Sequence, residues 1–211
     1  MKLQYIGHSC FELQSKNGAR VVTDPFDSSI GIDMPHLLAD VVTVSHQHHD
    51  HNNLSIIIGN YLSLNEIGEY SFSDIKIRGI ASNHDDVGGS KRGKNIIFCF
   101  DIDGLTVCHL GDLGEVPNSL QLKQIGKVDV LLIPVGEVFT LTVDKAIETC
   151  RLINPVITIP MHFKTDALAF ALSKPEKFLS LAGNFRDIKI SSLELTPENI
   201  GDYKGIILLN K

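Results

Sequence analysis

Short apolar runs rich in β-branched residues recur along the chain, and each is bounded by Gly, Asn, Asp or Pro. Runs of roughly four to eight such residues between turn formers are typical of buried strands. The pattern predicts strands at residues 3–6, 10–14, 20–23, 41–45, 75–80, 95–102, 105–110, 130–134, 156–160, 188–190 and 205–209. Two turn sequences, Ser15-Lys16-Asn17-Gly18 and Asp103-Gly104, predict hairpins between the strands on either side of them.

Helical spacing of apolar residues predicts helices at 118–125, 142–153 and 174–181. The first places Leu120, Leu122 and Ile125 near one face. Thr142 is a suitable N-cap for the second helix, and Pro175 fits the first turn of the third. Strands and helices in this order favour sheets packed on one another with helices outside, although chain order alone does not choose among the layered architectures.

The apolar run 41–45 stops abruptly at the sequence His46-Gln47-His48-His49-Asp50-His51. Because side chains alternate in extended backbone, His46 and His48 can point into one site, whereas His49 points away and is interpreted as a non-ligand. Asp50 and His51 follow, where a turn can aim both at a neighbouring position. More ligand-capable side chains stand here than one metal usually takes from one segment, so the spacing suits two adjacent metals.

Three further residues of metal-binding type, His84, Asp112 and His162, follow the apolar runs 75–80, 105–110 and 156–160. One His or Asp at a strand end is more often a cap or a turn residue. Four strand ends that all present such residues are poorly explained by chance, so the pattern indicates a metal site. Zn is the leading metal for an imidazole-rich set with carboxylates, and Mn and Fe stay open.

The same residues, together with their flanking segments, resemble the metallo-β-lactamase superfamily. Within it they resemble the small bacterial hydrolases related to ascorbate-6-phosphate lactonases, over about residues 3–166. The flanking segments that carry the resemblance are Gly7-His8-Ser9-Cys10-Phe11, Thr23-Asp24-Pro25-Phe26, Ser82-Asn83-His84-Asp85, His109-Leu110-Gly111-Asp112-Leu113-Gly114, the run 129–135 and Ile159-Pro160-Met161-His162-Phe163-Lys164-Thr165.

The resemblance implies a single α/β domain over residues 1–211, a four-layer αββα sandwich of two mixed sheets flanked by helices. It also implies two divalent cations at one edge of the sheets. The implied ligands are His46, His48 and His84 for the first cation and Asp50, His51 and His162 for the second, with Asp112 as the bridge. A bridging carboxylate lets two cations sit about 3.5–4 Å apart and share a hydroxide.

Other residues near these segments are candidates for supporting roles. His8, by resemblance, faces the site and could donate to substrate or act as a general acid; the alternative is a buried, hydrogen-bonded His. Asp24 could fix the tautomer of a ligand His, or simply end a strand before Pro25. His109 is interpreted as supporting the site or belonging to the core.

The glycine-rich basic loop 87–95 contains Arg92 and could hold an anionic substrate group, or could be a flexible solvated turn. Lys164 is another candidate anion contact. Glu115 and Glu137 depart from the pattern of the relatives, and an inward carboxylate at either position would disfavour an anionic substrate.

Composition narrows the function further. The chain has 211 residues, of which 43% are hydrophobic, and a net charge of −6 without a basic tract. We therefore expect neither nucleic acid nor a membrane as partner, but a small molecule that could be anionic; a homo-oligomer is open. Four cysteines without a CxxC pair, and no signal-peptide pattern, favour a cytoplasmic protein.

The predicted activity is dinuclear metal-dependent hydrolysis of a small ester, lactone or phosphoester. A hydroxide that bridges the cations is the expected nucleophile, and Asp50, Asp112 and His8 are the expected catalytic residues. No Ser-His-Asp arrangement is needed, because no serine lies in a G-x-S-x-G setting. The alternative is a di-iron redox or metal-binding protein of the same fold without hydrolytic activity.

Overall fold

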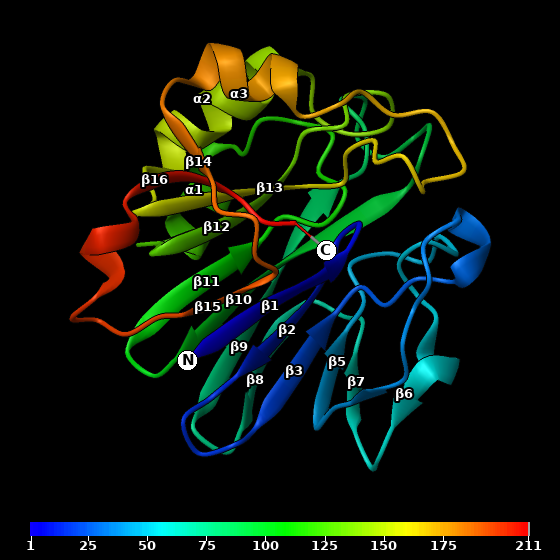
Figure 1. Cartoon of the computed structure of the whole chain (residues 1–211). Helices are drawn as coiled ribbons and strands as arrows, with labels where there is room; N and C mark the ends of the chain where they lie inside the picture. The colour runs from blue at the N-terminus through cyan, green and yellow to red at the C-terminus, as the bar shows by residue number, and fades with distance from the viewer. Residues whose placement is uncertain (211) are drawn as a thin grey trace.

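The computed structural model describes residues 1–210, which form two large sheets packed face to face (Figure 1). In spatial order, the six-stranded sheet consists of β15 (Ser192–Glu194), β1 (Lys2–Gly7), β2 (Cys10–Gln14), β3 (Arg20–Thr23), β5 (Val41–Thr43) and β7 (Leu62–Leu64). Its strands β3, β5 and β7 are parallel, and the others pair antiparallel. A separate parallel pair joins β4 (Leu37–Leu38) to β6 (Ile57–Ile58).

The eight-stranded sheet is also mixed. Its order is β14 (Phe185–Asp187), β16 (Gly205–Leu208), β13 (Ile157–Met161), β12 (Val130–Pro134), β11 (Leu105–His109), β10 (Lys94–Ile102), β9 (Ile75–Asn83) and β8 (Gly68–Phe72). Strands β8 to β11 are antiparallel, whereas β11, β12, β13 and β16 run parallel. The predicted fold class, a mixed α/β sandwich of two sheets, is confirmed.

Three α-helices lie on the outer face of the eight-stranded sheet: α1 (Ser119–Ile125), α2 (Val143–Ile153) and α3 (Glu176–Ala182) (Figure 1). The short 3₁₀ helices are η1 (Ser28–Ile30), η2 (Leu54–Ile56) and η3 (Ile200–Tyr203). On the six-stranded side, η1, η2 and the segments around β4 and β6 contribute to an apolar cluster with β3 and β5. Within residues 1–210, no helix has the length and apolar character needed to cross a bilayer.

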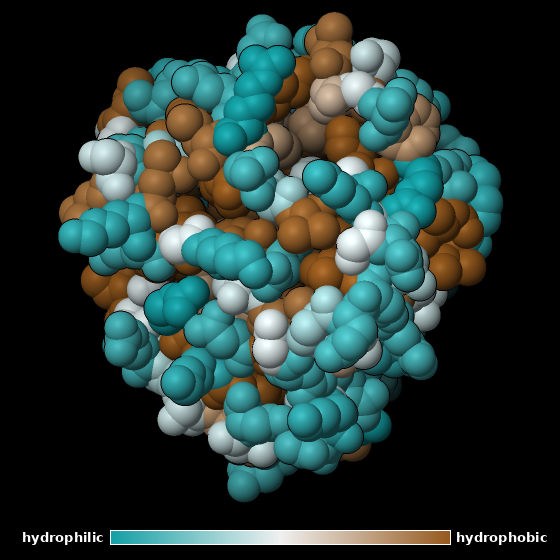
Figure 2. All heavy atoms as spheres, turned by 90° about the vertical axis from the view of Figure 1, so that its left-hand side faces the viewer, coloured by the Kyte–Doolittle hydropathy of each residue, from teal (hydrophilic) through white to brown (hydrophobic). Residues whose placement is uncertain are grey.

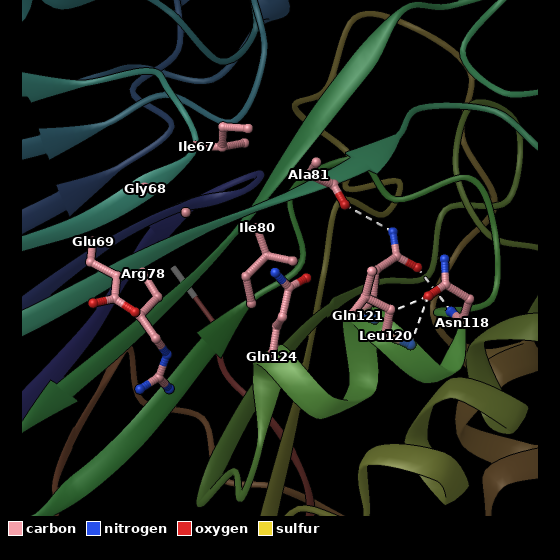
Figure 3. Close-up of a pocket in the computed structure, with 11 residues that line it drawn as sticks. Ile67, Gly68, Glu69, Arg78, Ile80, Ala81, Asn118, Leu120, Gln121 and Gln124 are labelled. Atoms are coloured by element: carbon pink, nitrogen blue, oxygen red, sulfur yellow. Dashed lines mark hydrogen bonds between the residues drawn. The ribbon is translucent and has the colours of Figure 1, made fainter.

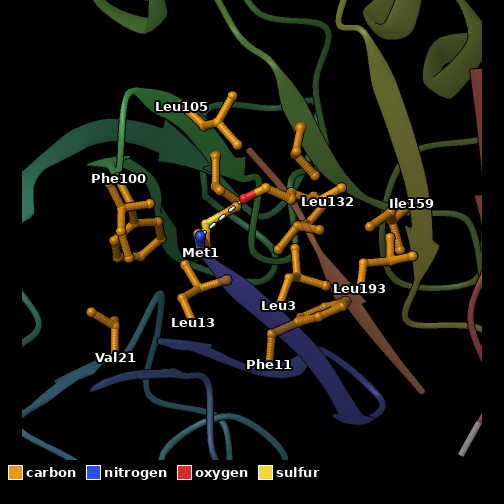
Figure 4. Close-up of a cluster of buried hydrophobic side chains, with 14 of the residues drawn as sticks. Met1, Leu3, Phe11, Leu13, Val21, Phe100, Leu105, Leu132, Ile159 and Leu193 are labelled. Atoms are coloured by element: carbon orange, nitrogen blue, oxygen red, sulfur yellow. Dashed lines mark hydrogen bonds between the residues drawn. The ribbon is translucent and has the colours of Figure 1, made fainter. Parts of the chain in front are cut away.

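The main core fills the space between the two sheets (Figure 4). Leu13 and Val21 reach it from the six-stranded sheet, and Phe100, Leu132 and Ile159 reach it from the eight-stranded one. A second cluster lies under the helices, so the eight-stranded sheet is covered on both faces. All five residues of β12 are buried for this reason, which explains why its sequence is apolar without alternation. Hydrophilic side chains cover most of the face shown in Figure 2 and separate the apolar areas.

Both predicted hairpins form, since β2 pairs antiparallel with β3 and β10 with β11. In the second turn Asp103 and Gly104 have φ of 51° and 79°, the left-handed values that a tight two-residue hairpin turn requires. The predicted strand at 188–190 is wrong: the strand is β14, and Lys189 has a left-handed φ of 53° that interrupts extended backbone. Strands β7, β8 and β15 were not predicted because they are short or largely exposed.

We expect the substitution Phe100→Ala to lower the free energy of unfolding by about 3–5 kcal/mol, because it leaves a cavity between the sheets. The Phe100 side chain is fully buried, whereas Phe185 on the edge strand β14 is 45% exposed and is a matched control. Denaturant unfolding of Phe100→Ala and Phe185→Ala measures the difference. Equal losses in the two variants would contradict this assignment of the core.

Candidate metal centre

Four strands of the two sheets end at one place. His84 directly follows β9, His162 directly follows β13, and Asp112 and His46 each stand three residues beyond β11 and β5. The N–H of Ile96 donates to the carbonyl oxygen of Ser45 (2.9 Å), which joins the two sheets at this edge. Side chains from distant parts of the sequence are thereby held close together by rigid strands.

The first group of ligand-capable atoms comes from His46, His48 and His84, and these atoms lie within 4.8 Å of one another. The centroid of the His46 ring is 4.7 Å from that of His48 and 4.7 Å from that of His84. His46 and His84 are buried, whereas His48 is exposed and opens the group to solvent. The group contains the three residues expected to hold the first cation.

The second group consists of His8, Asp50, His51 and His162, again with one atom each within 4.8 Å. The Nε2 atom of His8 lies 3.2 Å from Oδ2 of Asp50, and Nε2 of His51 lies 3.5 Å from the same oxygen. The rings of His8 and His162 are 4.3 Å apart. His8, which the resemblance places facing the site, therefore lies beside the three residues expected to hold the second cation.

Asp112 lies between the two groups. Its Oδ2 is 3.1 Å from Nε2 of His162, 3.3 Å from Nε2 of His84 and 3.8 Å from Nε2 of His46. Its Oδ1 is 3.3 Å from Nε2 of His51. Burial acts to raise the pKa of Asp112, but the charges of His162 and His51 hold that pKa well below its usual value. The carboxylate is thus kept ionised at a point that both groups face.

The unpaired polar atoms of the site test whether these residues suit metal ions. Within residues 1–210, the buried atoms without a hydrogen-bond partner include His46 Nε2, His51 Nε2, His84 Nδ1, both ring nitrogens of His162 and Asp112 Oδ1. Leaving so many buried polar atoms unpaired in one place is costly, and cations would satisfy one nitrogen of each imidazole and the free oxygen of Asp112. Imidazoles mixed with carboxylates suit Zn, Mn or Fe, so the residues present fit a pair of divalent cations.

Asp24 contacts the second group through the Nδ1 atom of His51. Its Oδ2 accepts hydrogen bonds from Nδ1 of His51 (2.9 Å) and from the hydroxyl of Ser45 (2.5 Å), and its Oδ1 accepts one from the N–H of Ser45 (2.8 Å). The bond to Nδ1 leaves Nε2 of His51 directed at Asp50 and Asp112. Asp24 thereby fixes the tautomer and the orientation of the His51 imidazole.

Asn95 positions Asp112 and was not singled out from the sequence. Its Oδ1 accepts the N–H of Asp112 (2.9 Å), while its Nδ2 donates to Ser82 Oγ (2.7 Å) and to the carbonyl oxygen of Leu110 (2.9 Å). Gly111 makes the close approach possible, because a Cβ there would stand 2.3 Å from Asn95 Oδ1. The sequence signal that could have indicated this role of Asn95 is a polar amide residue at the start of an otherwise apolar strand.

Three non-glycine residues of the site have left-handed backbone. His8, Asp24 and His162 have φ of 54°, 41° and 51°, values that residues other than glycine seldom adopt. The N–H of His162 donates to the carbonyl oxygen of His8 (3.0 Å), so two of these strained positions hold each other. Such strain persists where the surrounding structure imposes it, which often happens at functional sites.

His109 and Lys164 bond to nearby backbone. Nε2 of His109 donates to the carbonyl oxygen of Ser9 (2.8 Å), and its Nδ1 accepts the N–H of Gly111 (3.1 Å). Burial lowers the pKa of His109, so it is neutral and braces the His8–Ser9 turn. The ammonium of Lys164 donates to the carbonyl oxygens of Leu168 and Phe170, which makes it a brace of that loop.

The remaining candidates lie around the rim. The guanidinium of Arg92 stacks on the ring of Phe139, with 4.9 Å between its central carbon and the ring centroid. Glu115 accepts a hydrogen bond from Nδ2 of Asn83 (2.7 Å), and Glu137 pairs with Lys177 (2.8 Å). Both carboxylates are therefore engaged outside the two ligand groups. His49, interpreted as a non-ligand, is exposed, and so is His36.

The most spacious cavity described lies elsewhere, where β8 and β9 meet α1, and has a volume of about 630 Å³ (Figure 3). Gln121 lies along it and donates through Nε2 to the carbonyl oxygen of Ala81 (2.9 Å). Its only charged lining residues are Glu69 and Arg78, and no histidine reaches it. The cavity offers space without the groups that hydrolysis needs.

Comparison with known proteins agrees with this geometry. Residues 2–162 match the family model described as a beta-lactamase superfamily domain. A UPF0173 metal-dependent hydrolase of Thermoplasma acidophilum is 29% identical, with 87% of this chain and 91% of that protein covered. Another protein of that name, from Nanoarchaeum equitans, is 31% identical over 78% of this chain and 85% of its own length.

A solved structure is similar over almost the whole chain. It is a proposed Zn-dependent hydrolase of the metallo-β-lactamase superfamily from Thermotoga maritima, with 37% identity and a TM-score of 0.83. The match covers 99% of this chain and 97% of that one. By its family match, its relatives and its fold, this chain belongs to the β-lactamase superfamily, among relatives named metal-dependent hydrolases.

Proposed function

We propose that the protein is a dinuclear metal-dependent hydrolase that cleaves a small ester, lactone or phosphoester. The observation that carries the proposal is the Asp112 carboxylate, which faces imidazoles of both ligand groups at 3.1–3.8 Å. His46, His48 and His84 would hold one cation, and Asp50, His51 and His162 the other. Two such cations supply an activated water nucleophile and polarise the bond under attack.

The residues of the chain contribute orientation and charge. Asp112 would be the ligand that the two cations share, and Asp24 holds His51 in the tautomer that leaves Nε2 for a cation. Burial, and then the nearby His162, lower the pKa of His8 to about 4, so its imidazole is neutral at pH 7. A neutral His8 donates through Nε2 to Asp50, and we assign it a positioning role toward that carboxylate.

The space beside the first ligand group suits a small substrate. A pocket of about 340 Å³ has His46, His48, Arg92 and Lys94 among its lining residues. This volume lies at the lower end of the range of small-molecule sites. The two basic side chains favour a substrate with negative charge, and a lactone or simple ester is the first class to test. None of the four cysteines is in a disulfide, which suits a reducing compartment, and we propose a cytoplasmic location for the reaction.

Removal of metal tests the proposal directly. Purified protein is screened against small esters, lactones and phosphodiesters, then dialysed against a chelator and assayed again. We expect hydrolysis to fall at least about a hundredfold and to return with two equivalents of Zn or Mn per chain, since the nucleophile depends on the cations. Undiminished hydrolysis by the metal-free protein would contradict the mechanism.

The alternative, a di-iron redox or metal-binding protein of the same fold, is distinguished in the same preparation. A coloured protein that retains iron and hydrolyses none of the substrates would favour it. Colourless protein with two Zn or Mn per chain and ester hydrolysis favours the proposed function.

A further inference from the structure

Two buried cysteines face each other across the hairpin of β10 and β11. Cys99 of β10 is the register partner of Cys108 of β11. Both residues are fully buried and belong to the apolar cluster that lies under the helices. Neither belongs to the ligand groups of the candidate metal centre, and neither is in a disulfide. The proposed hydrolysis therefore does not use this pair of thiols.

Backbone hydrogen bonds show which kind of antiparallel pair the two cysteines form. The carbonyl oxygen of Thr106 and the N–H of Leu110 both hydrogen-bond to the segment 129–132. Alternate residues of β11, Cys108 among them, thus direct their backbone groups to β12 and not to β10. In such a non-hydrogen-bonded pair the Cα atoms are about 4.5 Å apart and the side chains lie closest to each other. Because a disulfide spans about 4.4–6.8 Å between Cα atoms, Cys99 and Cys108 can be bridged with little movement of the strands.

The surroundings of Cys99 favour its ionisation. Arg78 of β9 is the register partner of Cys99 on the other side, and its guanidinium pairs with Asp101 at 2.9 Å. The hydrogen bond from Cys108 lowers the pKa of the Cys99 thiol; burial opposes this effect, and the charge of Arg78 adds to the lowering. Cys99 is therefore the thiol of the pair that attacks an electrophile.

Arg78 also provides a route to Cys99 from solvent. It lines the cavity of about 630 Å³ between β8, β9 and α1, and its side chain is 31% exposed (Figure 3). One side of this residue thus borders open space, while the other side lies next to Cys99. A small, uncharged oxidant can enter beside the Arg78 side chain when that side chain moves, whereas a bulky reagent is kept out by the surrounding core.

We propose that Cys99 and Cys108 form a redox-modification site that reacts with a small peroxide and closes into a reversible disulfide. The Cys99 thiolate attacks one oxygen of hydrogen peroxide, the O–O bond breaks, and the departing hydroxide takes up the proton that Cys99 released. The sulfur of Cys108 then attacks the sulfenic sulfur of Cys99, and the S–O bond breaks. The proton of Cys108 leaves with this hydroxide as a second water. The two thiols lose two electrons, and the peroxide gains them.

Peptide mapping of the Zn-loaded protein tests this reaction. The folded protein is treated with hydrogen peroxide, unfolded, alkylated and digested with trypsin, which leaves both cysteines in the peptide 95–123 because no Lys or Arg lies between Lys94 and Lys123. We expect this peptide to carry no alkyl group and to be lighter by two hydrogen atoms. A protease that cuts before Asp101 should leave the two pieces joined until they are reduced. Without peroxide, both cysteines should be alkylated.

Three variants separate the roles of the thiols. Cys108→Ala should leave Cys99 as a sulfenic acid that dimedone traps, whereas Cys108 in Cys99→Ala should react at least about tenfold more slowly. Cys150→Ala is the matched control, because Cys150 of α2 packs against the same apolar cluster. Its disulfide between Cys99 and Cys108 should form at a rate within about twofold of that of the unmodified chain.

Three outcomes would overturn the inference. One is a bridge that forms only after the protein is unfolded in urea. Another is a bridge that joins Cys99 or Cys108 to Cys150. The third is equal reactivity of the two single thiols, which would contradict the activation of Cys99. Peptide mapping uses the unmodified chain, so a variant that does not fold leaves the first two outcomes decisive.

Discussion

Replacement of Asp112 by Asn is expected to lower kcat/KM for the best ester substrate by at least about a thousandfold, which corresponds to about 4 kcal/mol of transition-state stabilisation. The amide keeps the shape of the side chain but removes the negative charge that four histidine side chains face. We also expect the metal content to fall from the proposed two ions toward one per chain, because Asp112 is the proposed shared ligand.

A second buried carboxylate provides the control for Asp112→Asn. Asp129 is 5% exposed and accepts the N–H of Thr106 (2.9 Å), just before β12 and away from the metal ligands. Asp129→Asn should reduce stability while keeping metal content and kcat/KM within about twofold of the original. If Asp112→Asn also retained activity and both metals, the role of Asp112 as the bridge would be wrong.

Replacement of Asp24 by Asn is expected to weaken the affinity for the second cation about 10- to 100-fold. The effect is indirect, because Asp24 would not bind the metal but holds Nδ1 of His51 at 2.9 Å. The amide N–H of Asn would face the N–H of His51 Nδ1 or the donors of Ser45. Two donors cannot hydrogen-bond to each other, so the imidazole of His51 would be free to turn. The free energy of unfolding should also fall, by about 1–3 kcal/mol, because buried donors lose their acceptor.

Competition with a chromophoric chelator measures the metal affinity of Asp24→Asn, and denaturant unfolding measures its stability. The two readings separate the two roles open to Asp24. A fall in stability with unchanged metal affinity would show that Asp24 only ends β3 before Pro25 and has no role at the metal site. A fall in metal affinity that is absent from Asp129→Asn would establish its action through His51.

The predicted strands succeeded where burial dominates. Strands β2, β3 and β12 have the predicted bounds, because their apolar residues pack into the buried clusters on the two faces of the sheets. The strand β8 was not predicted, because it lies at an edge of the sheet and is largely exposed. Its residues pair with β9 through the backbone and do not need an apolar pattern. Local patterns record burial, whereas edge pairing depends on a neighbour that is distant in sequence.

The sequence by itself determined which residue types stand at the ends of four strands, and therefore that a metal site was to be expected. It also indicated that His49 points away, because alternation along extended backbone is a local property. Only the tertiary structure decided that His8 meets Asp50 through Nε2 and that Asn95 positions Asp112. The physical reason is distance along the chain: such contacts are set by sheet register and by packing between the sheets, which no local pattern records.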